Sequence, residues 1–107
     1  MEILQSEFEH KDSRRVLTQL ITGDIKQVNL YEASKGSTLG NHYHKETTEY
    51  FYILNGTATY NDSQVINKGV LFKVSPKERH TIRCLTPVRM MTFLSQPYTK
   101  ENTDIYV

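Results

Sequence analysis

The dominant feature of this sequence is a succession of short apolar runs, rich in β-branched and aromatic residues and separated by turn residues. Helical periodicity is nearly absent, so the pattern favours an all-β fold. Turn sequences such as Asn55-Gly56 and Asn67-Lys68-Gly69 stand between the runs, because Asn and Gly tolerate positive φ. The expected strands are Val16–Ile21, Ile25–Glu32, Thr38–His44, Glu49–Leu54, Thr57–Tyr60, Gln64–Ile66, Val70–Val74, His80–Leu85 and Val88–Leu94. Many short strands at this spacing predict a sandwich or a small barrel.

The length of 107 residues suits one compact domain, which we place at residues 1–107. The more polar segment Met1–Ser13 is expected to be an arm or an edge strand. The segment Gln96–Val107 is expected to be a short turn lying over the barrel.

Charge and cysteine content exclude several classes of protein. The net charge is +1, from 13 Lys and Arg against 12 Asp and Glu, which argues against nucleic acid or a membrane surface as partner. The longest apolar run, Tyr50–Leu54, is far shorter than the roughly 20 residues of a membrane span. Cys84 is the single cysteine, and the N-terminus lacks a signal-peptide pattern, so we expect a cytoplasmic protein without disulfides.

Three of the 4 histidines belong to one pattern. His42 and His44 are two residues apart, so in a strand both imidazoles point to the same face. A reversal after His44 would bring Glu49 to the same region, and His80 begins another expected strand.

Three imidazoles and one carboxylate suit a divalent transition metal (Fe, Mn, Ni or Zn) with one or two open positions. Calcium would require more carboxylates. The alternative is a set of hydrogen-bonded polar groups without a metal, although burying these groups unpaired is costly. We therefore predict His42, His44, Glu49 and His80 as metal ligands.

Residues next to these ligands are expected to form the pocket wall. Phe51 and Ile53 share the strand face of Glu49, and Ile82 and Cys84 share the face of His80. Cys84 is expected to be a small buried side chain and not a catalytic thiol.

The stretch Gly36–Gly56 has the spacing G-x5-H-x-H-x4-E-x6-G and resembles the first motif of the cupin superfamily at every fixed position. The stretch Gly69–Cys84 resembles the second motif, but Pro76 comes one residue late, Glu78 stands near the family glycine, and Cys84 replaces the family asparagine. The resemblance implies a single cupin domain, a double-stranded β-helix (jelly-roll) barrel of two antiparallel sheets with the metal inside. It also implies a homodimer, in which we expect Ile3–Phe8 to pair across the interface.

A finer resemblance concerns Gly40–Lys45, which is similar to a segment of cupins that act on nucleotide-linked sugars, such as ketoisomerases and the cupin domains of epimerase/reductases. Leu39 occupies the position of an arginine that could pair a substrate phosphate. The candidate cations to replace this arginine are Arg14, Arg15, Arg83 and Arg89.

These observations leave several functions open. The first is a metalloenzyme acting on a small organic or sugar-type molecule, either a dioxygenase with iron or an isomerase or epimerase with Zn, Mn or Ni. The second is a cupin that binds a small molecule without turnover, and the third is a dimer whose metal only stabilises the fold. In a nucleotide-sugar isomerase or epimerase, a histidine would act as base and not as ligand. Catalytic residues beyond the ligands stay unassigned.

Overall fold

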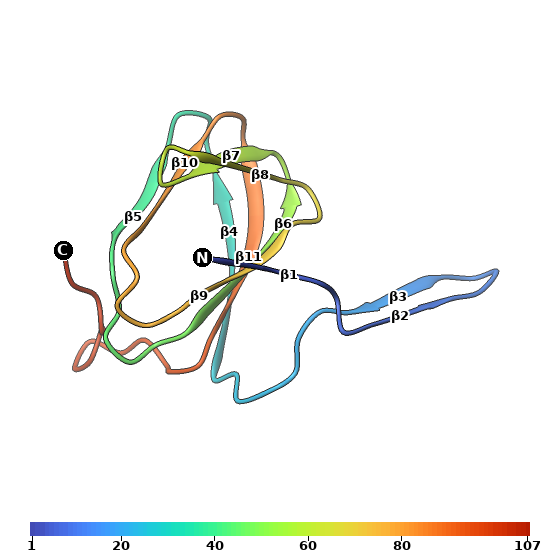
Figure 1. Cartoon of the computed structure of the whole chain (residues 1–107), viewed down its shortest axis with the longest axis horizontal. Helices are drawn as coiled ribbons and strands as arrows, with labels where there is room; N and C mark the ends of the chain where they lie inside the picture. Colours follow the sequence, from blue (N-terminus) through green and yellow to red (C-terminus); the bar gives the residue numbers. More distant parts are fainter.

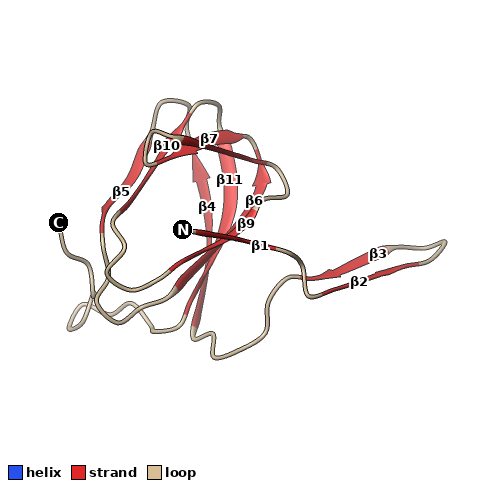
Figure 2. Cartoon of the chain, viewed as in Figure 1, coloured by secondary structure: helices blue, strands red, loops and turns tan.

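The computed structural model describes all 107 residues and contains strands, turns and loops only (Figure 2). The strands are β1 (Glu2–Leu4), β2 (Phe8–Lys11), β3 (Val16–Gln19), β4 (Gln27–Ala33), β5 (Thr38–His42), β6 (Glu49–Asn55), β7 (Thr57–Tyr60), β8 (Gln64–Asn67), β9 (Leu71–Val74), β10 (His80–Cys84) and β11 (Val88–Leu94). The all-β prediction is thus confirmed. No helix in the structure could cross a membrane.

Two antiparallel sheets enclose the core (Figure 1). The five-stranded sheet has the order β1-β9-β6-β11-β4, and the four-stranded sheet has the order β5-β10-β7-β8. Neighbours in each sheet are mostly distant in the sequence, as in a jelly roll, and the double-stranded β-helix prediction is confirmed. The strands β2 and β3 form a separate hairpin, which projects away from the barrel in Figure 1.

Alternation along the strands separates the core from the surface. In β6 the side chains of Glu49, Phe51 and Ile53 are buried, whereas those of Tyr50 and Tyr52 are half-buried on the outer face. The same alternation in the other strands fills the barrel with apolar side chains, and each fully buried large one contributes about 1.5–3 kcal/mol. The core cluster consists of Phe51, Ile53, Ala58, Tyr60, Ile66, Phe72, Val74, Ile82, Cys84, Val88 and Met90.

Gly56 allows the tight reversal between β6 and β7. Its φ is +96°, and a Cβ atom at this position would lie 2.2 Å from the carbonyl oxygen of Pro87. Only glycine fits both the conformation and the space.

All nine expected strands occur, with ends shifted by a few residues. The expectation that β5 extends to His44 is wrong, because the strand ends at His42 and Asn41 has a positive φ of 63°. Ile3–Phe8 is not one continuous strand, and its pairing across a dimer interface stays a prediction, because β1 is an edge strand of its sheet. Ile3 lies in β1, which pairs with β9 of the same chain, and Phe8 begins the projecting hairpin.

Candidate functional site

The irregular junction of β5 and β10 brings two histidines together. His42 and His80 are opposite one another in the register, and a bulge follows His80. Gly40 permits this close approach because a Cβ atom there would lie 2.9 Å from the carbonyl oxygen of His80, at a φ of +87°.

His44 completes a cluster of three imidazoles, although it lies beyond the end of β5. The ring centroids are 5.0 Å apart for His42 and His44, 4.6 Å for His42 and His80, and 5.2 Å for His44 and His80. One ring nitrogen from each histidine lies within 4.8 Å of the other two. His44 and His80 are buried, and His42 is half-buried.

Glu49 adds a buried carboxylate to this cluster. It is the first residue of β6, and its Oε1 atom lies 3.2 Å from Nε2 of His44 and 3.6 Å from Nε2 of His80. The structure therefore brings the four predicted ligands to one place, with Glu49 in contact with two of the histidines.

The C-terminal segment orients His44. The Nδ1 atom of His44 donates a hydrogen bond of 2.8 Å to the carbonyl oxygen of Asp104, because a carbonyl can only accept. In neutral His44 the Nε2 lone pair then faces the carboxylate of Glu49. Nε2 of neutral His44 and Oε1 of Glu49 are both acceptors, and two acceptors 3.2 Å apart require a proton or a cation beside them. These nitrogen and oxygen atoms therefore fit a metal ion as ligands.

The side chain of Asp104 fixes the loop that follows His44. Its carboxylate accepts hydrogen bonds from the backbone N–H groups of Lys45 (3.0 Å), Glu46 (2.9 Å) and Thr47 (2.8 Å), and from the Thr47 hydroxyl (2.8 Å). The backbone of Tyr106 also pairs with that of Tyr43. The C-terminal segment is therefore part of the site.

The environment sets the protonation of the histidines. Burial, together with the nearby His80 and His44, lowers the pKa of His42 to about 4. Burial also lowers the pKa of His80. Burial acts to lower the pKa of His44 too, but the hydrogen bonds to Glu49 and to the Asp104 carbonyl outweigh it and raise this pKa. At neutral pH, His42 and His80 are thus neutral imidazoles, the form that binds metals.

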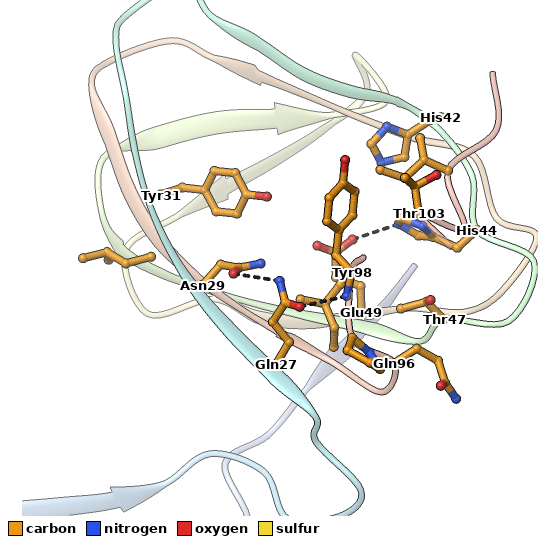
Figure 3. Close-up of a pocket in the computed structure, with 14 residues that line it drawn as sticks. Gln27, Asn29, Tyr31, His42, His44, Thr47, Glu49, Gln96, Tyr98 and Thr103 are labelled. Carbon is orange, nitrogen blue, oxygen red and sulfur yellow. Dashed lines mark hydrogen bonds and ion pairs between the residues drawn. The ribbon is translucent and has the colours of Figure 1, made fainter. Parts of the chain in front are cut away.

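Two pockets open onto the cluster. The larger, of about 410 Å³, extends from the histidines past Glu49, and in Figure 3 the hydroxyl of Tyr31 points toward its middle. It is lined by Gln27, Asn29, Leu30, Tyr31, His42, His44, Thr47, Glu49, Leu94, Gln96, Pro97, Tyr98, Thr103 and Ile105. The smaller, of about 240 Å³, is lined by Tyr31, Thr38, Leu39, Gly40, His42, Glu49, Phe51, His80, Ile82 and Met90.

The predicted wall residues fall into two groups. Phe51 and Ile82 line the smaller pocket. Ile53 and Cys84 lie deeper, within the core cluster, because one more step along each strand takes the side chain away from the pocket. Burial raises the pKa of the Cys84 thiol, as suits a core residue.

The four arginines considered as phosphate partners lie outside both pockets. Arg83 pairs with Asp62 at 2.8 Å on the barrel surface. Arg14 and Arg15 lie in the turn of the projecting hairpin, and Arg89 lies on the outer face of the five-stranded sheet. Both site pockets are therefore lined without Lys or Arg.

Sequence reasoning missed the pocket residues of β4 and of the C-terminal segment. In β4 the polar or amphipathic side chains Gln27, Asn29 and Tyr31 line the pocket, while Val28 and Leu30 are exposed and only Leu30 of these two borders the pocket. Polar and apolar residues alternate along β4 in the sequence, but such a pattern usually indicates that the apolar face points inward. The C-terminal segment has no periodicity that could have revealed its role.

Comparisons with known proteins place this geometry in context. The family model described as "Polysaccharide biosynthesis C-terminal domain" matches residues 10–88. A search of curated protein sequences found no match.

Several solved structures share the cupin jelly-roll fold of this chain. The sugar 3,4-ketoisomerase QdtA of Thermoanaerobacterium thermosaccharolyticum, in complex with TDP, is 22% identical over 94% of this chain and 82% of its own, with a TM-score of 0.73. The rmlC epimerase of Mycobacterium tuberculosis is 18% identical over 90% of this chain and 64% of its own, with a TM-score of 0.71.

The capsular polysaccharide assembling protein CapF of Staphylococcus aureus is a longer relative of the same fold. It is 23% identical over 99% of this chain and 32% of its own, with a TM-score of 0.65. This chain thus spans about a third of the length of CapF.

Proposed function

The chain belongs to the polysaccharide biosynthesis C-terminal domain family, and from this premise we propose that it is a metal-binding cupin that acts on a sugar-type substrate. The observation that carries the proposal is the convergence of three imidazoles and one carboxylate beside a pocket of about 410 Å³. The fold relatives include a sugar ketoisomerase and an epimerase, which favours isomerisation or epimerisation over the dioxygenase alternative.

The proposed ligands are His42, His44, Glu49 and His80. A bound divalent transition ion would supply Lewis-acid polarisation of a substrate oxygen. The carboxylate of Glu49 would help to hold the ion, and the Asp104 carbonyl keeps the His44 ring in place.

Neutral polar groups of the larger pocket suit a polyhydroxylated molecule. The hydroxyl groups of Tyr31, Tyr98 and Thr103 and the amide of Gln96 can each donate and accept hydrogen bonds. The two tyrosine rings also offer apolar faces to the C–H groups of a sugar ring.

The ligand set is tested by titrating cobalt(II) into metal-stripped protein and recording the visible absorption of the ion. The wild type should saturate near one equivalent, and His80→Ala should weaken binding by roughly 100-fold or more. His10→Ala is the matched control, because His10 lies in the hairpin beside Asp12, and its titration should match the wild type. Equal cobalt binding by wild type and His80→Ala would contradict the proposal.

A second candidate function uses His42 as the base of a nucleotide-sugar isomerase or epimerase. The observation in its favour is that His42 is the histidine that lines both pockets. Proton removal next to the carbonyl would then exchange deuterium from D₂O into a TDP-linked 4-keto sugar. If His42→Ala keeps its cobalt and loses this exchange, His42 is the base; if it loses both, His42 is a ligand. Cobalt binding without exchange in the wild type would favour a cupin that binds without turnover.

A further inference from the structure

The walls of the two pockets beside the histidine cluster carry one acidic group, the carboxylate of Glu49, which lines both pockets. Apart from the histidines, every other lining residue is neutral. In the larger pocket, side chains such as Asn29, Gln96 and Tyr98 offer amide and hydroxyl groups, which can donate and accept hydrogen bonds (Figure 3). Such a wall complements the hydroxyl groups of a ligand, but it leaves a negatively charged group without an ionic partner.

Leu39 makes one wall of the smaller pocket apolar. It pairs with Ile82 of β10, and Ile82 is 1% exposed, so the Leu39 side chain also points into the barrel. Leu39 packs against the core and lines the smaller pocket together with Phe51, Ile82 and Met90. A phosphate group in this pocket would lose its water of hydration and would gain no cation in return.

Two cations are neighbours of the predicted metal ligands in the sequence, but both lie against tyrosine rings. The guanidinium carbon of Arg79 is 5.6 Å from the ring centroid of Tyr43, and its Nη1 donates a hydrogen bond of 3.2 Å to the carbonyl oxygen of Asn41. The Nζ atom of Lys45 is 4.3 Å from the ring centroid of Tyr106. Neither cation lines either pocket, so neither faces the space in which a substrate would lie.

The charge of a bound metal ion also has to be counted. The carboxylate of Glu49 offsets one of the two charges of a divalent ion. Under the proposed function, the open positions of the ion take an oxygen of the sugar at which the reaction occurs. A diphosphate attached to the same sugar would lie several bonds away from that oxygen, where only neutral or apolar walls remain.

We propose that this site takes an uncharged sugar and selects against nucleotide-diphosphate sugars, an inference that rests on the proposed function and narrows its substrate class. A neutral sugar can use the amides and hydroxyls of the larger pocket and the ring faces of Tyr31 and Tyr98. A diphosphate would be desolvated beside Glu49 and Leu39, and an unpaired charge costs far more than an unpaired hydroxyl. Leu39 is therefore a residue that determines specificity.

The proposal is tested by ligand titrations of the full chain, followed in ¹H–¹⁵N NMR spectra. The side-chain amides of Asn29 and Gln96 report occupancy of the larger pocket. The neutral probes are the methyl glycosides of glucose, galactose, mannose and fucose, and the charged probes are TDP and TDP-glucose. Metal-stripped and zinc-loaded protein are titrated separately, so that the charge of the ion is a separate variable. The wild type should bind at least one methyl glycoside, and TDP-glucose at least roughly 10-fold more weakly.

Two variants add a cation to the pocket walls. Leu39→Arg in the smaller pocket and Gln96→Arg in the larger should each strengthen TDP binding by roughly 10-fold or more, because a charge-assisted hydrogen bond to phosphate becomes available. Gln96 is exposed, so its variant should fold even if Leu39→Arg does not. Val65→Arg is the matched control, since Val65 is 57% exposed and lines neither pocket, and its TDP binding should match the wild type.

Circular dichroism establishes which variants are folded, and stronger TDP binding by either folded pocket variant supports the proposal. Wild-type binding of TDP-glucose that equals or exceeds that of every methyl glycoside would overturn the inference, while a sugar-type substrate would stand. A wild type that binds cobalt(II) but none of the probes would overturn the sugar-type substrate and the inference together, and would leave the metal site standing. Folded pocket variants that bind TDP no better than Val65→Arg would also overturn the inference.

Discussion

Asp104 anchors the loop after His44, so its replacement should destabilise the protein and disturb the site together. Its carboxylate accepts the four hydrogen bonds from Lys45, Glu46 and Thr47 described above. Hydrogen bonds to charged groups are worth about 1.5–3 kcal/mol each. The N–H groups of Lys45 and Glu46 belong to exposed residues and regain water in part, whereas Thr47 is buried. The two Thr47 bonds therefore dominate the loss, at about 3–6 kcal/mol.

Asp104→Ala carries a further cost, because Asp104 has a φ of +50°. Alanine is disfavoured in this region by about 1–2 kcal/mol, whereas asparagine tolerates it. Asp104→Asn keeps one carbonyl-type acceptor and should lose about 1–2 kcal/mol, less than half the loss in Asp104→Ala.

The assay is urea unfolding of metal-stripped protein at constant concentration, followed by circular dichroism. The tautomer of His44, read from the ¹⁵N shifts of its ring, reports the site independently of stability. At a pH above the raised pKa of His44, the single ring proton of the wild type should be on Nδ1, which donates to the Asp104 carbonyl, and in Asp104→Ala this preference should be lost. An unfolding free energy within about 1 kcal/mol of the wild type, with an unchanged tautomer, would refute the reasoning.

Three other substitutions test separate parts of the structure. Gly40→Ala should cost about 1–3 kcal/mol in urea unfolding, because its Cβ would lie 2.9 Å from the His80 carbonyl at a positive φ; a neutral effect would show that the junction is not tight. Ile53→Ala should cost about 2–5 kcal/mol in the same assay, since Ile53 is completely buried, and a smaller loss would contradict the assigned core. The backbone N–H of Thr22, followed by the Gln19 amide and the Thr22 hydroxyl, donates to Glu7 and lowers the Glu7 pKa below 4.5. The stabilisation from Glu7 is therefore present above pH 4.5 and lost as the pH falls through the lowered pKa. The NMR chemical shift of the Thr22 backbone amide should titrate below pH 4.5 in the wild type and should not titrate in Glu7→Gln.

The barrel strands were predictable because each is a local pattern. In Glu49–Asn55 a run of apolar and aromatic residues predicts a strand with alternating buried and outer side chains, and Gly56 predicts the turn that follows it. The cluster of His42, His44, Glu49 and His80 was predictable for a related reason. Two of its members are two residues apart, and the cupin resemblance supplied the positions of the other two.

The rest of the site depends on contacts between distant segments. Asp104 bonds to residues 57 to 59 positions earlier in the chain, and no local pattern marks that pairing. The polar face of β4, with Gln27 and Asn29, points inward because a pocket and not a core lies beneath it. The first strand of the hairpin, β2, was anticipated only as part of an arm or edge strand, since Phe8–Lys11 is short and mostly polar, whereas its partner β3 lies within the expected strand Val16–Ile21.

The most direct test of the central claim, a metal site at the histidine cluster, is the metal content of the full chain purified without chelator. Elemental analysis should find about one equivalent of Fe, Mn, Ni or Zn in the wild type and almost none in the His44→Ala/His80→Ala variant. The His10→Ala variant should retain the wild-type content. A wild type that is free of metal, and that stays free after incubation with these ions, would contradict the account.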